Sequence, residues 1–216
     1  QTVADRLATS GVNTPSELLY AWFRFSGQAR DIKAGTYELS PGTTPRTLLS
    51  KLVRGEQALR SITLLEGWNI RQLRAALNSA TPLLHETEKL DDAALMKLLG
   101  HGGQHPEGRF LPETYVYSRG DTDVDVLKRA HAAMEKALAS TWEARAKDVP
   151  LKSAEEALIL ASIIEKETGL ASERPQIAGV FARRLKLGMK LQTDPTVIYS
   201  IGSAYDGNIR RRDLLT

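Results

Sequence analysis

Two glutamates follow an apolar run in this chain, at a spacing that could place a carboxyl group where acid–base chemistry is possible. Residues 158–164 are aliphatic apart from one serine, and the triplet Glu165-Lys166-Glu167 comes directly after them. An ionised carboxylate is costly to bury unless it is paired or protonated, so a carboxyl group against an apolar face often has a perturbed pKa. Such groups are frequent at catalytic sites, which makes this triplet the first candidate for one.

The pattern around the triplet predicts a helix and separates its two acids. Ser153 and Glu156 form a capping-box pattern, and Gly169 is expected to end the helix in a left-handed conformation. Side chains two positions apart on a helix point to nearly opposite sides. Glu165 continues a small and partly polar row. The row that leads to Glu167 is large and aliphatic, and consists of Leu160, Ile163 and Ile164. We therefore expect Glu167 to be the desolvated, catalytic acid and Glu165 to support it.

Simpler interpretations stay open for both acids. A carboxylate near a helix end is commonly solvated, so Glu167 could be a surface residue, with Glu165 and Lys166 solvated beside it. Glu165 has two further alternatives, because it could orient a partner group or pair with an arginine such as Arg184.

A polar segment further along the chain offers groups for ligand binding. Residues 172–188 predict a second helix, and Asp194 before a proline predicts the N-cap of a third. Gln192, Thr193 and Asp194 bring an amide, a hydroxyl and a carboxylate to that helix start, and Tyr199 follows about one turn later. This mixture suits hydrogen bonding to a sugar or a peptide, although capping alone is the simpler interpretation of Asp194.

Several segments together match the pattern of one known family. They include residues 161–168 (ASIIEKET), 172–174, 180–181, 184–185 and 191–199 (LQTDPTVIY), and upstream residues 34–37, 65–67 and 107–115 (EGRFLPETY). In these segments the chain resembles the endolytic murein transglycosylase, or YceG-like, family from about residue 31 to its C-terminal end. The resemblance implies that Glu167 is the catalytic acid, as the helical spacing also indicates.

The resemblance implies a definite reaction on peptidoglycan. Such an enzyme cleaves the β-1,4 bond between N-acetylmuramic acid and N-acetylglucosamine in nascent glycan strands, leaves a 1,6-anhydro end and thereby terminates strand elongation. It requires no cofactor and no metal, and its partners are glycan strands and cell-wall synthases. A non-catalytic peptidoglycan-binding or scaffold protein is the alternative, and an ordinary hydrolase is a third possibility.

The resemblance also implies a membrane-anchored protein. The family carries a single N-terminal transmembrane anchor in the inner membrane, with its catalytic part in the periplasm. This sequence begins with glutamine and has no apolar run of the roughly 20 residues that span a bilayer. The family continues well beyond the position of Thr216, so we expect the chain to be cut at both ends and its catalytic region to be incomplete.

Composition narrows the remaining function classes. The chain has 216 residues, of which 42% are hydrophobic and 25% charged, with a net charge of +3. The absence of cysteine excludes disulfides, thiol nucleophiles and cysteine-bound zinc. Two basic clusters, at 183–186 and 210–212, are more typical of solvated surface than of a nucleic-acid site, so we expect no nucleic-acid partner.

Histidine spacing does not indicate a metal centre. The chain has four histidines, which are His85, His101, His105 and His131. His101 and His105 lie in a glycine-rich loop with no acid beside them, and this favours solvent exposure over metal binding. We therefore expect no metal site.

Hydrophobic patterns and turn residues predict an α+β fold in two domains. On pattern alone, residues 1–65 should form a small α+β unit, and the family resemblance implies that this unit is a LysM-like peptidoglycan-binding module with an N-terminal helix. Residues 66–216 should form a mainly helical catalytic region. The elements predicted for the first domain are helix 15–25, strand 36–39, a helix from 45 that ends at Gly55, and strand 60–65. The second should contain helices 70–77, 91–99 and 123–146.

An aromatic segment at 108–117 is a further candidate for substrate contact. Aromatic faces stack on sugar rings, so Tyr115 and Tyr117 could line a glycan groove, although packing in the core is equally plausible. Glu113 in the same segment is expected to anchor the loop.

Overall fold

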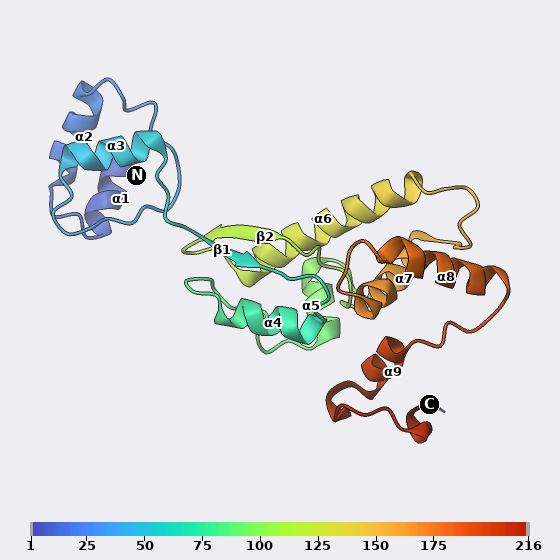
Figure 1. Cartoon of the computed structure of the whole chain (residues 1–216). Coiled ribbons are helices and arrows are strands. Elements are labelled where there is room, and N and C mark those ends of the chain that lie inside the picture. The colour runs from blue at the N-terminus through green and yellow to red at the C-terminus, as the bar shows by residue number, and fades with distance from the viewer. Residues whose placement is uncertain (1, 215–216) are drawn as a thin grey trace. The chain divides into compact units, whose positions relative to one another are not determined.

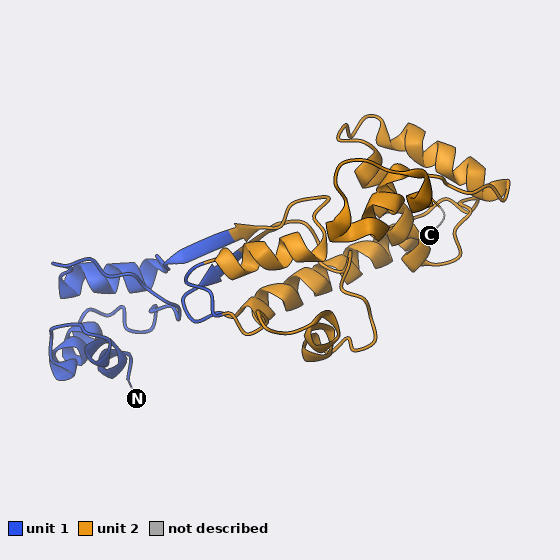
Figure 2. Cartoon of the chain, turned by 90° about the horizontal axis from the view of Figure 1, so that it is seen from below, with its two compact units in different colours: residues 1–61, 81–84, 116–121 blue, residues 62–80, 85–115, 122–216 orange. Residues whose placement is uncertain are grey.

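The chain is mostly helical and carries one small sheet, as the α+β prediction requires. A computed structural model describes residues 2–214. Its elements follow one another as shown in Figure 1, and the only sheet among the described residues has two strands. The chain divides into two compact units (Figure 2), of which the first contains residues 1–61, 81–84 and 116–121. The second contains residues 62–80, 85–115 and 122–216.

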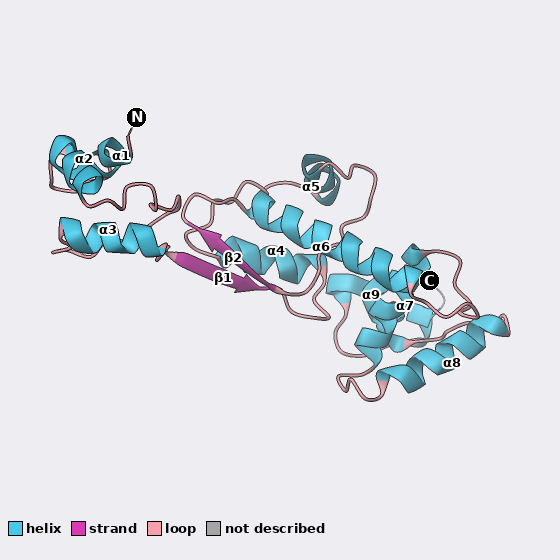
Figure 3. Ribbon diagram, turned by 90° about the horizontal axis from the view of Figure 1, so that it is seen from above, coloured by secondary structure: helices cyan, strands magenta, loops and turns pink. Residues whose placement is uncertain are grey.

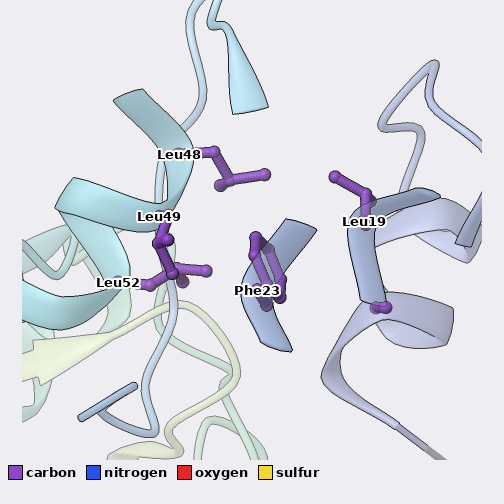
Figure 4. Close-up of a cluster of buried hydrophobic side chains, with 6 residues drawn as sticks. Leu19, Phe23, Leu48, Leu49 and Leu52 are labelled. Atoms are coloured by element: carbon purple, nitrogen blue, oxygen red, sulfur yellow. The ribbon is translucent and has the colours of Figure 1, made fainter. Parts of the chain in front are cut away.

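The first unit is a small helical cluster. It contains α1 (Val3–Thr9), α2 (Ser16–Phe25) and α3 (Pro45–Arg54). As predicted, α3 has proline at its first position and ends at Gly55, whose φ of 73° is the left-handed conformation that glycine adopts without strain. Leucines of α3 pack against α2 in the buried core (Figure 4), which is made of Ala4, Leu19, Phe23, Leu48, Leu49 and Leu52.

The strand predicted at residues 36–39 does not form. Its polar groups make separate contacts and no ladder of hydrogen bonds to another described strand. The Thr36 carbonyl accepts from the Ala58 amide at 2.9 Å, and the Tyr37 hydroxyl donates to the Lys33 carbonyl at 2.8 Å. The prediction of a strand there was wrong. The LysM-like module, of which that strand would be a part, stays a prediction.

The sheet pairs segments that are far apart in the sequence. Strand β1 (Leu59–Thr63) pairs with β2 (Thr114–Ser118), and β1 replaces the predicted strand 60–65. The Thr63 and Thr114 hydroxyls lie 2.8 Å apart, and the Leu64 amide donates to the Glu113 carbonyl at 3.0 Å. Position 63 thus faces 114 and position 64 faces 113, which is an antiparallel register.

The second unit contains the remaining helices (Figure 3). They are α4 (Ile70–Ser79), α5 (Asp92–Leu99), α6 (Asp123–Glu143), α7 (Ala154–Glu167), α8 (Arg174–Lys186) and α9 (Asp194–Ile201), followed by 3-10 turns η1 (Gly202–Ala204) and η2 (Arg211–Leu214). Helices α4 and α6 begin where predicted and α5 begins one residue later, because Asn69, Asp91 and Thr122 cap their first turns. Helix α7 contacts α6, α8 and α9. Among the described residues, we find no helix of sufficient length and apolarity to cross a bilayer.

Both ends of α7 differ from the prediction. Ser153 caps the helix, because its hydroxyl accepts from the Glu156 amide. In a capping box the Glu156 carboxylate would accept from the Ser153 amide in return, but here it accepts from the Lys152 amide at 2.6 Å. At the other end, Thr168 has extended backbone and Gly169 has no left-handed φ. The Thr168 hydroxyl accepts from the Leu170 amide at 3.0 Å, and this side-chain contact replaces the glycine cap.

A buried aspartate joins α6 to the chain that precedes α5. Asp123 is fully buried, and its carboxylate accepts from the Glu86 amide at 3.0 Å and from the Thr87 amide and hydroxyl at 3.0 and 2.6 Å. A buried carboxylate is tolerated when several donors satisfy it. This interaction therefore fixes the turn at 86–87 against the first residue of α6.

Replacing this carboxylate should destabilise the protein strongly. Asp123→Ala leaves two amides and a hydroxyl without their acceptor, and we expect a loss of about 3 kcal/mol or more in the free energy of unfolding, measured by urea denaturation. Asp148→Ala removes an exposed partner of Lys186 and should leave the unfolding midpoint unchanged. Equal midpoints for the two variants would contradict the role assigned to Asp123.

Candidate active site

The two glutamates at the end of α7 lie in different surroundings, but not in the ones predicted. Glu165 is only 29% exposed, and its Oε2 atom lies 3.0 Å from Nη2 of Arg174 at the start of α8. The partner is thus Arg174 and not Arg184, which donates to the carbonyls of residues 190 and 191 instead. Glu167 is exposed.

The expected desolvation of Glu167 by its apolar row was wrong. Leu160 of that row is buried, and Ile163 and Ile164 are half-buried. Glu167, however, is the last helical residue, and the extended backbone of Thr168 follows it directly. The apolar face therefore ends one turn before the acid, and the described chain leaves the Glu167 carboxyl open to solvent.

A hollow lies beside Glu165. It has a volume of about 400 Å³ and is lined by residues of α7 and α8, namely Ala161, Ile164, Glu165, Arg174, Pro175 and Ala178. Gly67, from the loop before α4, has a φ of 72°, and a side chain there would lie 3.5 Å from the Lys166 ammonium and 3.8 Å from Cγ of Glu165. Of the triplet, Glu165 thus lines a small hollow and contributes with Arg174 the ion pair in its wall.

The loop before β2 connects three helices of this unit. Glu107 accepts from the Ile70 amide at 3.1 Å through Oε1 and from the Tyr199 hydroxyl at 3.1 Å through Oε2, which joins the start of α4 to α9. Arg109 donates to both carboxylate oxygens of Glu155, in the first turn of α7, at 2.6 and 2.7 Å. The sequence pattern indicated no specific role for Glu107 and Arg109. The one indication of a role in the sequence was their position on either side of Gly108, within the segment 107–115.

The segment before α9 has an unusual backbone. Gln192 has a φ of 54°, and it is the only non-glycine residue with positive φ among the described residues. This conformation costs about 1 kcal/mol for a residue with a Cβ atom. The Arg184 guanidinium donates to the Leu191 carbonyl at 2.5 Å and thereby holds the preceding residue in place.

The four predicted binding residues of this segment are exposed to different degrees. Gln192 and Asp194 are exposed, and the Tyr199 side chain is 57% exposed. Thr193 is buried, occupies the N-cap of α9 and accepts through its carbonyl from the Thr196 hydroxyl at 2.8 Å. Asp194 is the first helical residue and not the predicted N-cap. Because α7 contacts α9, these residues belong to the same group of packed helices as the triplet.

The aromatic segment forms part of the core. Tyr115 and Tyr117 are 7% and 4% exposed, so of the two interpretations left open the structure supports packing in the core and not an open groove. The Tyr115 hydroxyl donates to the Leu111 carbonyl and the Tyr117 hydroxyl to the Thr81 carbonyl, at 2.8 and 3.1 Å. The alternation of a β-strand turns both rings to the same buried face, and the exposed Val116 between them to the other.

Solvent exposure was expected for His101 and His105, and it holds for His105 but not for His101, which is half-buried. His131 on α6 is 2% exposed and stacks on His101, with ring centroids 3.7 Å apart. Its pKa is lowered by burial and then by the neighbouring His101. No acid lies beside His101 in the sequence. In the structure an acid does lie close to the two histidines, since Glu135 follows His131 by one turn of α6.

Comparison with known proteins identifies the family. The model of the YceG-like family matches residues 1–216, the whole chain. The chain belongs to the YceG-like family. This match confirms the resemblance that residues 161–199 indicated.

Named relatives of this YceG-like chain include two bacterial enzymes. The endolytic murein transglycosylase of Bacillus subtilis (strain 168) is 29% identical over 221 residues, which cover 94% of this chain and 61% of that protein. The endolytic murein transglycosylase of Streptococcus pneumoniae serotype 2 is 25% identical over 214 residues, covering 86% of this chain and 38% of that protein. The chain thus spans less than two thirds of the length of these relatives.

A solved structure supports the YceG-like fold. The crystal structure of a YceG-like protein from Listeria monocytogenes matches with a TM-score of 0.57 and 24% identity. The match covers 99% of this chain and 75% of that one.

The contact between Glu107 and Tyr199 should be visible in a titration. Burial raises the pKa of the Tyr199 phenol, and the negative charge of Glu107 and its hydrogen bond raise it further. Glu107→Gln removes the charge that opposes the phenolate, so the pKa of Tyr199 should fall towards its ordinary value. Titration followed by NMR of 13C-labelled tyrosine measures this change.

Tyr115 is the internal control for this titration. Its pKa is also raised, by burial and then by Glu113, neither of which the substitution at Glu107 alters. A shift of both tyrosines by the same amount would indicate a general change of structure and contradict the specific contact.

Proposed function

We propose that this chain carries the catalytic glutamate of an endolytic peptidoglycan lytic transglycosylase. The observation that supports this most directly is an accessible acid, Glu167, at the end of α7 in a chain whose whole length matches the YceG-like family. The relatives named endolytic murein transglycosylase point to the same substrate, the glycan strand of peptidoglycan. The bond cleaved is the β-1,4 bond from N-acetylmuramic acid to N-acetylglucosamine, and cleavage ends the elongation of a nascent strand.

One carboxyl group suffices for this reaction. Glu167 protonates the glycosidic oxygen as the bond to the anomeric carbon breaks, and then accepts the proton of the muramoyl 6-hydroxyl as that oxygen attacks the same carbon. The product is a 1,6-anhydro end, and no water is consumed. Hydrolytic glycosidases use a second carboxylate, but an intramolecular nucleophile has an orientation advantage that makes one dispensable.

The exposure of Glu167 suits a polymeric substrate. A glycan strand can reach an acid at a helix end without entering a deep cavity. Glu165 fits a supporting role, because its carboxylate is half-buried and forms an ion pair with Arg174. We propose that Glu165 and Arg174 together hold the junction of α7 and α8 beside Glu167.

Residues 192–199 are the proposed binding segment. Gln192, Asp194 and Tyr199 present an amide, a carboxylate and a phenol at exposed positions, and such groups hydrogen-bond sugar hydroxyls and acetamido groups. Thr193 contributes through the helix start that it caps. Tyr115 has a buried ring, so its contribution is to hold the loop that carries Glu107 and Arg109.

The cellular setting of the whole protein follows from the same proposal. We place the protein in the inner membrane through a single N-terminal anchor, with the catalytic part in the periplasm, where cell-wall synthases make its substrate. Residues 1–65 are the proposed LysM-like contact to peptidoglycan.

Substitution of the proposed acid tests this function. In the full-length protein, Glu167→Gln should fold normally and release no 1,6-anhydro-muropeptides from purified sacculi, as measured by mass spectrometry. Glu143→Gln is a matched control, because Glu143 is also an exposed glutamate at the last residue of a helix, and it should retain full product formation. Glu165→Gln should reduce product formation without abolishing it.

The products also distinguish the alternatives. Unchanged product formation by Glu167→Gln would exclude it as the catalytic acid. Reducing-end muramic acid in place of the anhydro form would identify a hydrolase. A wild-type protein that binds sacculi and releases nothing would indicate a non-catalytic peptidoglycan-binding or scaffold protein.

A further inference from the structure

Three potential metal ligands meet between α5 and α6, away from the glutamate triplet. They are His101, from the loop after α5, and His131 and Glu135, one turn apart on α6. One donor atom of each lies within 4.8 Å of those of the other two. Nδ1 of His131 is 3.7 Å from Oε2 of Glu135, which is longer than a hydrogen bond.

Local backbone geometry fixes the two histidines in place. Gly100 ends α5 with a φ of 92°, and the His101 amide donates to the Met96 carbonyl at 2.8 Å, so the backbone of His101 is fixed at the helix end. His131 and Glu135 lie on the same face of α6, because residues four apart are neighbours on a helix surface. The packing of α5 on α6 then brings the two histidine rings together.

The buried ring of His131 presents its Nδ1 atom to this cluster. The side chain is 2% exposed, and Nδ1 is the nitrogen that lies 3.7 Å from Oε2 of Glu135. The other ring nitrogen, Nε2, is buried without a hydrogen-bond partner among the described residues, and an ion bound through Nδ1 would not change this. The convergence of three donor atoms from two elements is therefore the observation that points to a ligand.

We propose that His101, His131 and Glu135 bind a divalent transition-metal ion of the Zn²⁺ type, with water as the fourth ligand. Imidazole nitrogen and carboxylate oxygen are ligands that Zn²⁺ accepts, and three protein ligands with one open position are a common arrangement. Two ligands of a tetrahedral zinc ion, each about 2.1 Å from it, lie about 3.4 Å apart, close to the spacing seen between His131 and Glu135.

Binding requires only side-chain rotation. The stacked rings of His101 and His131 are inclined by 24°, so their lone pairs must turn towards a common point. His101 is half-buried and Glu135 is exposed, and both can adjust around the fixed His131 ring. The bound ion would cross-link the end of α5 to α6 and fix the start of the loop that leads to Glu107 and Arg109.

Zinc titration of the chain tests the site independently of any enzymatic activity. After removal of metals with EDTA, calorimetric titration with ZnCl₂ should show one saturable site per chain, and Zn²⁺ should raise the melting temperature. His101→Gln and Glu135→Gln should each weaken binding at least tenfold and remove most of the thermal shift. Both replace ligands outside the fully buried core, so the fold is retained and circular dichroism verifies it.

His105→Gln is the matched control. His105 is an exposed histidine four residues further along the same loop and outside the cluster, so its substitution should leave zinc affinity unchanged. Three results would overturn the proposal: no saturable binding by the wild-type chain, wild-type affinity in either ligand variant, or an equal loss in His105→Gln.

Discussion

The polar contacts of the loop 106–111 attach α7 and α9 to the rest of the second unit. Helix α9 buries none of its residues in the described structure, and α7 buries only Leu160. Apolar burial, the usual source of helix packing energy, is therefore weak for both helices. The Tyr199–Glu107 hydrogen bond and the bidentate Arg109–Glu155 pair supply fixed attachment points instead. The latter pair is partly exposed and contributes about 1 kcal/mol, enough to select one arrangement without making it rigid.

This mode of attachment explains why the two acids of the triplet differ. The ion pair with Arg174 lies where α7 meets α8, so Glu165 is covered by the helix junction and its charge is compensated. Glu167 is the final residue of α7, beyond the packed part of the helix, and its carboxyl group is free of such a partner among the described contacts. A positioning acid belongs at the packed junction, and an acid that must meet a polymer belongs at the exposed end. The observed division matches these requirements better than the buried acid expected from helical spacing.

Local signals in the sequence predicted the helices well and the site only in part. Asn69, Asp91 and Thr122 specify the starts of α4, α5 and α6 through contacts within one turn, and Gly55 specifies the end of α3. Non-local contacts decided the failures. The segment 36–39 has the composition of a strand but has no described strand to pair with. The sequence left open whether Tyr115 is exposed or buried, and its position on β2 places the ring in the core. Helical spacing gives the direction of a side chain, but not whether another segment covers it.

The histidine cluster shows the same limit in its strongest form. His101 and His131 are 30 positions apart, and no spacing rule for metal ligands connects them, whereas the packing of α5 on α6 stacks their rings. The sequence shows that His131 and Glu135 are four residues apart on one helix. Two ligands are too few for a zinc site, however, and the third, His101, comes from the loop after α5. Since the loop that begins at His101 also carries Glu107 and Arg109, an ion held at its start would restrict the same segment that positions α7 and α9. We infer that the proposed ion would act on the placement of the helices and not on the proposed chemistry at Glu167.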